Sequence, residues 1–239
     1  MPSFGRSKVC AHCIANRFHW IWHVSKFRHV EFDLSDDDRA ALFRTYVGEE
    51  PRSTGANVRA FFRATFAAWT NRQGSGRERF HVGYSPIVVV DADRIFADLP
   101  EAHVVHVVRN PWSAYADTKR RPVPLGLDGY MLRWSVCQMH ALRGRAAYPG
   151  RLHLLRVEDV MADPQGTLGR LCAALGLETA DTLARPSWNG VPLQDVYPWG
   201  TIRQATPEAN RAAADSLTGA EREAIRLWTS PYLEALGYQ

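Results

Sequence analysis

The residues best placed to do chemistry follow the apolar run HVVHVV at positions 103–108. Arg109 comes directly after this run, and Pro111 stands where a helix would begin. If the run is a buried strand of a parallel sheet, Arg109 lies beyond its carboxyl end, where open sheets bind ligands. A guanidinium there offers a bidentate fork to a phosphate, and a helix N-terminus adds unpaired amide groups. The pattern predicts either an anion site or a structural ion pair of Arg109, and physical reasoning alone favours neither.

Three further side chains belong to the same predicted helix, which we place at residues 111–120. Ser113 falls in its first turn and can donate a hydroxyl hydrogen bond. Asp117 and Thr118 lie about two turns into it. Because the hydroxyls attract a phosphate and the carboxylate repels one, these positions decide what kind of anion site this is.

Composition narrows the class of protein without deciding its function. The chain of 239 residues has 46% hydrophobic and 23% charged residues, which is typical of a globular protein. Four cysteines are too few for a disulfide scaffold, so we expect a reducing cytoplasm. No apolar run approaches the ~20 residues of a membrane helix, and basic residues interrupt every candidate leader in the first 25 positions. The net charge of +4 is mild, and basic residues are spread along the chain, which argues against nucleic-acid binding.

The elements that must position Arg109 can be read from periodicity. We predict strands at 79–83, 103–108 and 151–157, and leave 86–90 open between strand and helix because its β-branched run opens on a proline. Strands that alternate with helices indicate an α/β fold with a mainly parallel sheet. The predicted helices, the fifth ended by Gly176, are 33–47, 57–69, 111–120, 128–148, 163–175, 207–216 and 218–236.

Three ordered segments resemble one family. They are GYSPIVVVDADRIFADLPEAHVVHVVRNP from Gly83, LHLLRVEDVMADPQGTLGRLCAALGL from Leu152 and the closing PYLEALGY from Pro231. Together they are similar to the sulfotransferases of bacterial type that use 3′-phosphoadenosine 5′-phosphosulfate (PAPS). The resemblance implies a P-loop-NTPase-like three-layer fold, with a central, mainly parallel sheet flanked by helices, as one domain over residues 1–239. It also assigns residues 87–90 to a helix.

The resemblance implies a function as well. Such an enzyme moves a sulfuryl group from PAPS to an acceptor hydroxyl or amine by in-line displacement, without a metal. We expect the acceptor to be a small molecule or a glycan, and expect no nucleic-acid or membrane partner. The alternative is a non-catalytic nucleotide-binding or regulatory protein of the same fold.

The family's site residues carry over position by position. Arg109 matches the arginine that holds the 3′-phosphate. The family's serine eight positions later is Asp117 here, so either Thr118 or Ser113 takes its role or the register slips by one. Arg203 is the counterpart of a basic residue in a late loop that closes over the 3′-phosphate.

Two more family positions differ in this chain. The family's base lies in a K-T-H-x-P run, which here is GYSP, so His81 is the nearest candidate base. In the family's Y-E-D triplet the tyrosine is Val157. We expect Glu158 and Asp159 to cap the following helix and pair with arginines.

The largest departure lies at the start. The family opens with a strand and a P-K-[ST]-G-T-T loop that cradles the 5′-phosphosulfate, whereas this chain begins MPSFGRSKVCAHC. Either the strand and loop precede the sequence given, which we favour, or the protein has given them up. Cys10, Cys13, His19 and His23 form a possible zinc set, but their spacing is not that of a zinc finger, so we expect no metal site.

Overall fold

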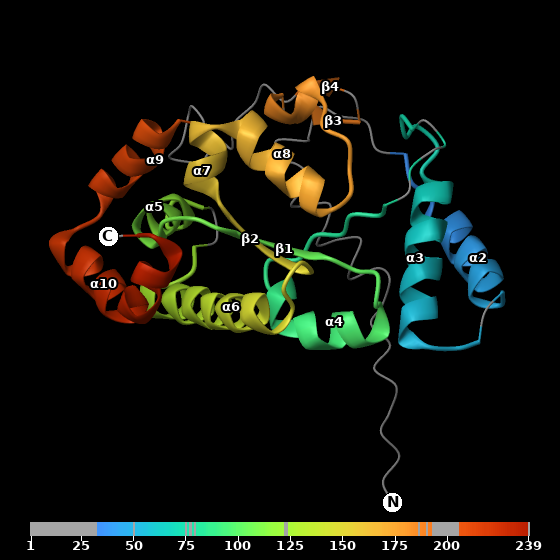
Figure 1. Cartoon of the computed structure of the whole chain (residues 1–239), viewed down its shortest axis with the longest axis horizontal. Coiled ribbons are helices and arrows are strands. Elements are labelled where there is room, and N and C mark those ends of the chain that lie inside the picture. Colours follow the sequence, from blue (N-terminus) through green and yellow to red (C-terminus); the bar gives the residue numbers. More distant parts are fainter. Residues whose placement is uncertain are drawn as a thin grey trace, which may run out of the picture.

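A computed structural model describes residues 33–49, 51–74, 76, 78, 80–121, 124–185, 187–189, 191–192 and 206–238. Its centre is a pair of parallel strands, β1 (Val104–Val108) and β2 (Leu152–Arg156). The register pairs Val104 with Leu152 and Val108 with Arg156. Helices α4 (Ala92–Asp98) and α6 (Leu127–Ala147) lie on one side of this pair, and α7 (Val157–Ala162) and α8 (Pro164–Ala174) on the other (Figure 1).

Buried and exposed side chains alternate along β1, and this pattern shows which face of the strand packs in the core. Val104, His106 and Val108 are buried, whereas the intervening Val107 is 55% exposed. The buried side chains join a core with α6, which also includes Phe96 of α4. A strand with this period-two pattern buries one face and leaves the other open, so β1 is held mainly from the α6 side.

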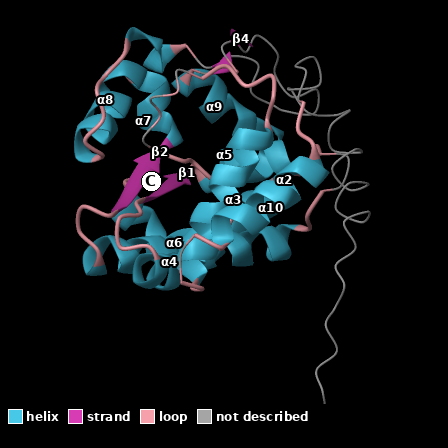
Figure 2. Ribbon diagram, turned by 90° about the vertical axis from the view of Figure 1, so that its right-hand side faces the viewer, coloured by secondary structure: helices cyan, strands magenta, loops and turns pink. Residues whose placement is uncertain are grey.

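The remaining elements surround these strands (Figure 2). Ser35 caps α2 by accepting from the Asp38 amide, and Thr218 forms a capping box with Glu221 at the start of α10. Gly176 follows α8 with φ +66°, the left-handed conformation expected where that helix ends. The other elements are α2 (Asp36–Val47), α3 (Thr54–Ala68), η1 (Val88–Asp91), α5 (Pro111–Thr118), η2 (Asp181–Ala184), β3 (Ser187–Trp188), β4 (Val191–Pro192), α9 (Pro207–Ala213), η3 (Ala214–Ser216), α10 (Gly219–Leu233) and η4 (Glu234–Leu236).

The ambiguous run at 86–90 is helical. Val88–Asp91 form the 3₁₀ helix η1, which continues into α4, as the family resemblance predicted. Val89 is 1% exposed and packs in the core with Phe96 and Val104. Burial among neighbours therefore overrides the β propensity of three consecutive valines.

One prediction about local structure is wrong. The stretch 79–83 is not a strand where the structure describes it, because no strand lies beside it and Val82 is 85% exposed.

Helix α3 packs through its small residues. Its buried side chains are Ala56, Ala60, Ala64 and Ala68. These alanines recur every four residues and form a narrow ridge that lets neighbours approach closely, whereas Phe61 is 48% exposed.

The described chain is thus a mixed α/β structure with a small parallel sheet, which confirms the α/β class. Over these same residues, the helices are too short or too polar to cross a bilayer.

Candidate anion site at the carboxyl ends of the strands

Arg109 leaves β1 and turns into a partly buried cluster. Its Nε donates to Asn210 Oδ1 at 2.7 Å, and its Nη1 donates to Asp117 Oδ2 at 3.2 Å. Its carbonyl accepts from Trp134 Nε1 at 3.3 Å, which fixes the backbone. The Arg109 side chain is 18% exposed, and its buried Nη2 has no hydrogen-bond partner among the described residues. Nη2 is therefore the donor of this guanidinium that an additional oxyanion could engage.

Asn210 joins this arginine to two other parts of the chain. The residue lies in α9 and is 1% exposed. Its Nδ2 donates to Glu158 Oε1 at 2.8 Å, and its carbonyl accepts from Ser113 Oγ at 2.6 Å. Asn210 therefore orients the guanidinium from a helix that is 101 residues away in sequence.

Glu158 is the acceptor at the centre of the cluster. It lies in the first turn of α7, directly after β2. Its Oε1 accepts from the Asn110 amide at 2.8 Å, and its Oε2 accepts from the Tyr238 hydroxyl at 2.8 Å. We expected Glu158 to pair with an arginine, but its described partners are three neutral donors: the Asn110 amide, the Asn210 side chain and the Tyr238 hydroxyl. Asp159 does lie near an arginine, with 3.9 Å between its Oδ2 and Arg156 Nε.

Tyr238 closes the cluster from the C-terminal end of the described chain. The residue is 6% exposed. Burial first, and then the adjacent Glu158 carboxylate, raise the pKa of the Tyr238 phenol well above its ordinary value. The hydroxyl therefore stays protonated and donates to Glu158. The guanidinium of Arg156 lies over a face of the Tyr238 ring, 4.6 Å from its centroid.

The start of α5 does not offer the free amides that the sequence suggested. Asn110 is the N-cap, and its Oδ1 accepts from the amides of Trp112 and Ser113. Pro111 has no N–H, and the Ala114 amide donates to the Asn110 carbonyl. Because the chain's own cap satisfies these donors, the charge for an anion comes from Arg109 and not from the helix end.

Ser113 and Thr118 are turned inward. Ser113 is 1% exposed and its hydroxyl donates to the Asn210 carbonyl. Thr118 is 3% exposed and hydrogen bonds the hydroxyl of Tyr130, whose pKa is raised chiefly by burial. Of the three α5 candidates, the structure places only the Asp117 side chain on the guanidinium of Arg109.

The other predicted site residues are not joined to this cluster. His81 is exposed and stacks on Phe62 and Phe66 of α3, with ring centroids 5.8 and 5.3 Å apart. Within the described part of the chain, no contact links His81 to Arg109. Arg203 lies outside the described residues. So do the four possible zinc ligands, Cys10, Cys13, His19 and His23.

Sequence reasoning missed Asn210 and Tyr238. The signal for Asn210 was present, because it is a polar residue inside the alanine-rich stretch PEANRAA, where a core-facing amide must find partners. Tyr238 gave no such signal, since a tyrosine near the end of a chain is equally at home on the surface.

Comparison with known proteins now identifies the family. The model of the sulfotransferase family matches residues 7–181. This chain belongs to the sulfotransferase family, as the ordered segments predicted. A similar solved structure is the sulfotransferase domain from the curacin biosynthetic pathway, at 17% identity and a TM-score of 0.44, covering 90% of this chain and 84% of that one. None of the curated proteins matches the sequence.

The described residues hold no group of three or more histidine, cysteine, aspartate or glutamate side chains that could bind a metal ion. The charged groups of the cluster are two arginines, Arg109 and Arg156, and two carboxylates, Asp117 and Glu158. Glu158 is engaged by neutral donors, so Arg109 and Asp117 determine how the site responds to an anion.

Proposed function

We propose that this protein transfers a sulfuryl group from PAPS to an acceptor hydroxyl or amine by in-line displacement. An acceptor lone pair attacks sulfur, the bond from sulfur to the 5′-phosphate oxygen breaks, and 3′,5′-adenosine bisphosphate leaves. The acceptor's proton passes to a base. The proposal rests on membership of the sulfotransferase family. The same family argument extends the fold to a P-loop-like three-layer arrangement, in keeping with a parallel pair that has helices on both sides.

The observation that supports a nucleotide site is the buried Nη2 of Arg109. This donor has no described partner, while Nε is held by Asn210. With Nε anchored, Nη2 has no described partner and Nη1 is shared with Asp117, so an oxyanion that displaces this carboxylate can bind both terminal nitrogens. Such a fork suits the 3′-phosphate of PAPS. Arg203 is a second proposed phosphate ligand.

Asp117 fits this ligand less well. Its carboxylate shares Nη1 of Arg109, so a phosphate that binds in bidentate fashion must take that donor from Asp117. The two anions then repel each other. We infer that Asp117 weakens nucleotide binding in this chain compared with the serine found at the matching position of the family.

His81 remains our candidate base, and its exposed ring leaves room for an acceptor. A base must reach the acceptor within hydrogen-bonding distance when the substrate is bound, and apo geometry does not exclude a candidate. We propose a small molecule or a glycan as the acceptor and a cytoplasmic location, the latter from the low cysteine content.

The function is tested by titrating the full chain with 3′,5′-adenosine bisphosphate and, separately, with 5′-AMP in a calorimeter. We expect a preference of about tenfold or more for the bisphosphate, equivalent to one charge-assisted phosphate contact. Equal affinities, or no binding of either, would remove the basis for a PAPS site. Incubation with labelled PAPS and a panel of sugars, phenols and amines then distinguishes the enzyme from the non-catalytic nucleotide-binding protein. Binding without transfer to any acceptor or to water favours the non-catalytic alternative.

A further inference from the structure

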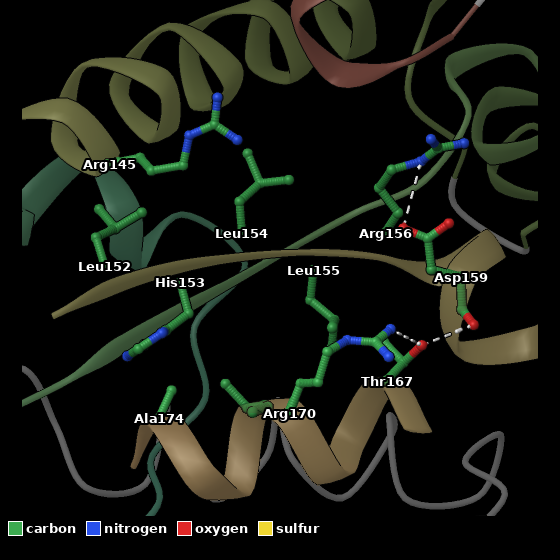
Figure 3. Close-up of a pocket in the computed structure, with 11 residues that line it drawn as sticks. Arg145, Leu152, His153, Leu154, Leu155, Arg156, Asp159, Thr167, Arg170 and Ala174 are labelled. Carbon is green, nitrogen blue, oxygen red and sulfur yellow. Dashed lines mark hydrogen bonds and ion pairs between the residues drawn. The ribbon is translucent and has the colours of Figure 1, made fainter. Parts of the chain in front are cut away.

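A groove runs along the edge of β2 that faces away from β1. It encloses about 380 Å³ between α6 and α8. Figure 3 shows side chains from both faces of β2 reaching into it, with Leu152 and Leu154 toward α6 and His153 and Leu155 toward α8. The groove therefore wraps around the strand edge, and its floor is largely leucine.

No strand lies beside this edge among the residues that the structure describes. The Val104 amide donates to the Arg151 carbonyl at 2.9 Å, so Arg151 and every second residue after it face β1. Leu154 consequently directs its N–H and C=O away from β1, into the groove. Among the described residues neither group has a hydrogen-bond partner. A strand edge with free donors and acceptors is a template for one more strand.

Charge on the groove is predominantly positive. Arg145 of α6, Arg156 of β2 and Arg170 of α8 line it, against the single carboxylate of Asp159. Arg145 is exposed and has no partner in the described part of the chain, and Arg170 bonds only the Thr167 hydroxyl, at 3.1 Å. Arg156 Nε is buried without a hydrogen bond, 3.9 Å from Asp159. The groove therefore carries more positive than negative charge, which favours an anionic occupant.

Charge also distinguishes between the possible occupants. Residues 1–32 carry five lysines and arginines and one acidic residue, Glu31, so this segment is repelled by the groove. A second copy of the β2 edge would set arginines against arginines. An extended segment of another protein that carries acidic and apolar side chains complements both surfaces. Its carboxylates can pair with the arginines, and its apolar side chains can pack on the leucines.

We propose that the β2 groove binds an extended acidic segment of a partner protein, which adds as a strand beside β2 with its carboxylates against Arg145 and Arg170. Main-chain bonds to Leu154 supply affinity, and the arginines select the acidic sequence. The groove adjoins the Arg109 cluster, because Arg156 lines the groove and also lies over the Tyr238 ring. Peptide binding in the groove does not depend on the proposed sulfuryl transfer.

The test uses a fluorescein-labelled peptide of about ten residues, a length that covers a typical strand, in which pairs of glutamates alternate with pairs of valines. This pattern places carboxylates on both faces of the added strand, where they can reach Arg145 on one side and Arg170 on the other. Fluorescence anisotropy with the full chain is expected to show binding. The peptide N-methylated throughout, and its lysine–valine counterpart, are expected to bind at least about tenfold more weakly, since the first cannot form the ladder and the second is repelled. Equal binding of either would overturn the proposal.

Two variants and a matched control complete the experiment. Arg145→Glu and Arg170→Glu are each expected to weaken the glutamate–valine peptide about tenfold, whereas Arg133→Glu, an exposed arginine on the same helix as Arg145, leaves binding unchanged. Peptide binding that all three variants leave unaltered would overturn the proposal. Hydrogen exchange at the Leu154 amide is expected to slow when the peptide is added. An amide already protected in the free protein would show the edge covered by residues 1–32 or a second copy, and would also overturn it.

Discussion

Asp117 Oδ2 lies 3.2 Å from Nη1 of Arg109, at the position where the resembled family has a serine. The pair is mostly buried, with 18% of the Arg109 side chain and 22% of the Asp117 side chain exposed. The chain thus supplies an internal anion to the arginine that we assign to the nucleotide phosphate. Phosphate binding in this protein is an exchange of partners and not the filling of an empty cationic site.

Removing the charge of Asp117 should strengthen nucleotide binding. Two unit charges about 4 Å apart interact by about 1 kcal/mol even in water, so Asp117→Asn is expected to tighten 3′,5′-adenosine bisphosphate about fivefold or more. Calorimetric titration measures the change. Asp215→Asn, which alters an exposed carboxylate paired with Arg222, should have no effect. Weaker binding in Asp117→Asn would mean that the carboxylate positions Arg109 and does not compete with the phosphate.

Loss of Asn210 should destabilise the fold as well as the site. Asn210→Ala removes the acceptor of Arg109 Nε and one donor to Glu158, and both of these residues are partly buried. The variant is expected to lower the free energy of unfolding by about 2 kcal/mol. Urea unfolding measures this loss. Arg211→Ala, on the same helix but 70% exposed, is the control and should change it by less than about 0.5 kcal/mol. If the two variants unfold alike, the cluster does not contribute to stability.

Two helical glycines should respond to alanine in opposite ways. A Cβ at Gly55 of α3 would clash with the Asp98 carbonyl oxygen, whereas a Cβ at Gly129 of α6 would meet nothing within 4 Å. We expect Gly55→Ala to lower the free energy of unfolding by about 1–3 kcal/mol. Gly129→Ala should raise it by about 0.5–1 kcal/mol through helix propensity. Thermal unfolding of both variants provides the measurement, and stabilisation by Gly55→Ala would show that α3 and α4 do not approach this closely.

His106 should make the protein less stable in mild acid. Burial lowers the pKa of His106 below its ordinary 6.5, and the hydrogen bond with Gln138 offsets only part of this effect. As the pH falls through 6.5, the unfolded chain therefore takes up a proton at this residue before the folded protein does, and stability falls.

The variant His106→Gln tests this linkage. Between about pH 7.5 and 5.5 the free energy of unfolding should decline more steeply in the natural protein than in the variant. His153, whose pKa is also lowered by burial, is present in both proteins and cancels in the comparison. His81→Gln, at an exposed histidine, is the control. Parallel pH profiles for the natural protein and His106→Gln would contradict the prediction.

The sequence was sufficient to predict those elements whose pattern has a single physical explanation. The apolar run 103–108 became β1, and the proline after Arg109 became the first residue of α5. Gly176 marked the end of α8 through local chemistry that needs no tertiary contact. The run 87–90 was ambiguous because valine suits a strand locally, and only packing against Phe96 and Val104 makes it helical.

The site was only partly accessible to sequence reasoning. Arg109 could be placed at a strand end, since parallel strands expose their carboxyl ends to ligands. Its partners could not, because Asn210 and Tyr238 reach Arg109 and Glu158 from segments about 100 and 80 residues away in the chain. Ser113 and Thr118 looked like phosphate ligands by position, but the rotation of α5 turns both hydroxyls into the core.

The most direct test of the account is the effect of Arg109→Ala on discrimination between 3′,5′-adenosine bisphosphate and 5′-AMP. Each nucleotide is titrated into the natural protein, into Arg109→Ala and into Arg226→Ala, whose arginine lies on the surface of α10 and pairs with Glu223. Arg109→Ala should abolish the preference for the bisphosphate while 5′-AMP binding stays within about twofold, and Arg226→Ala should keep the preference intact. A preference that survives in Arg109→Ala would contradict the account, because the 3′-phosphate would then be bound elsewhere.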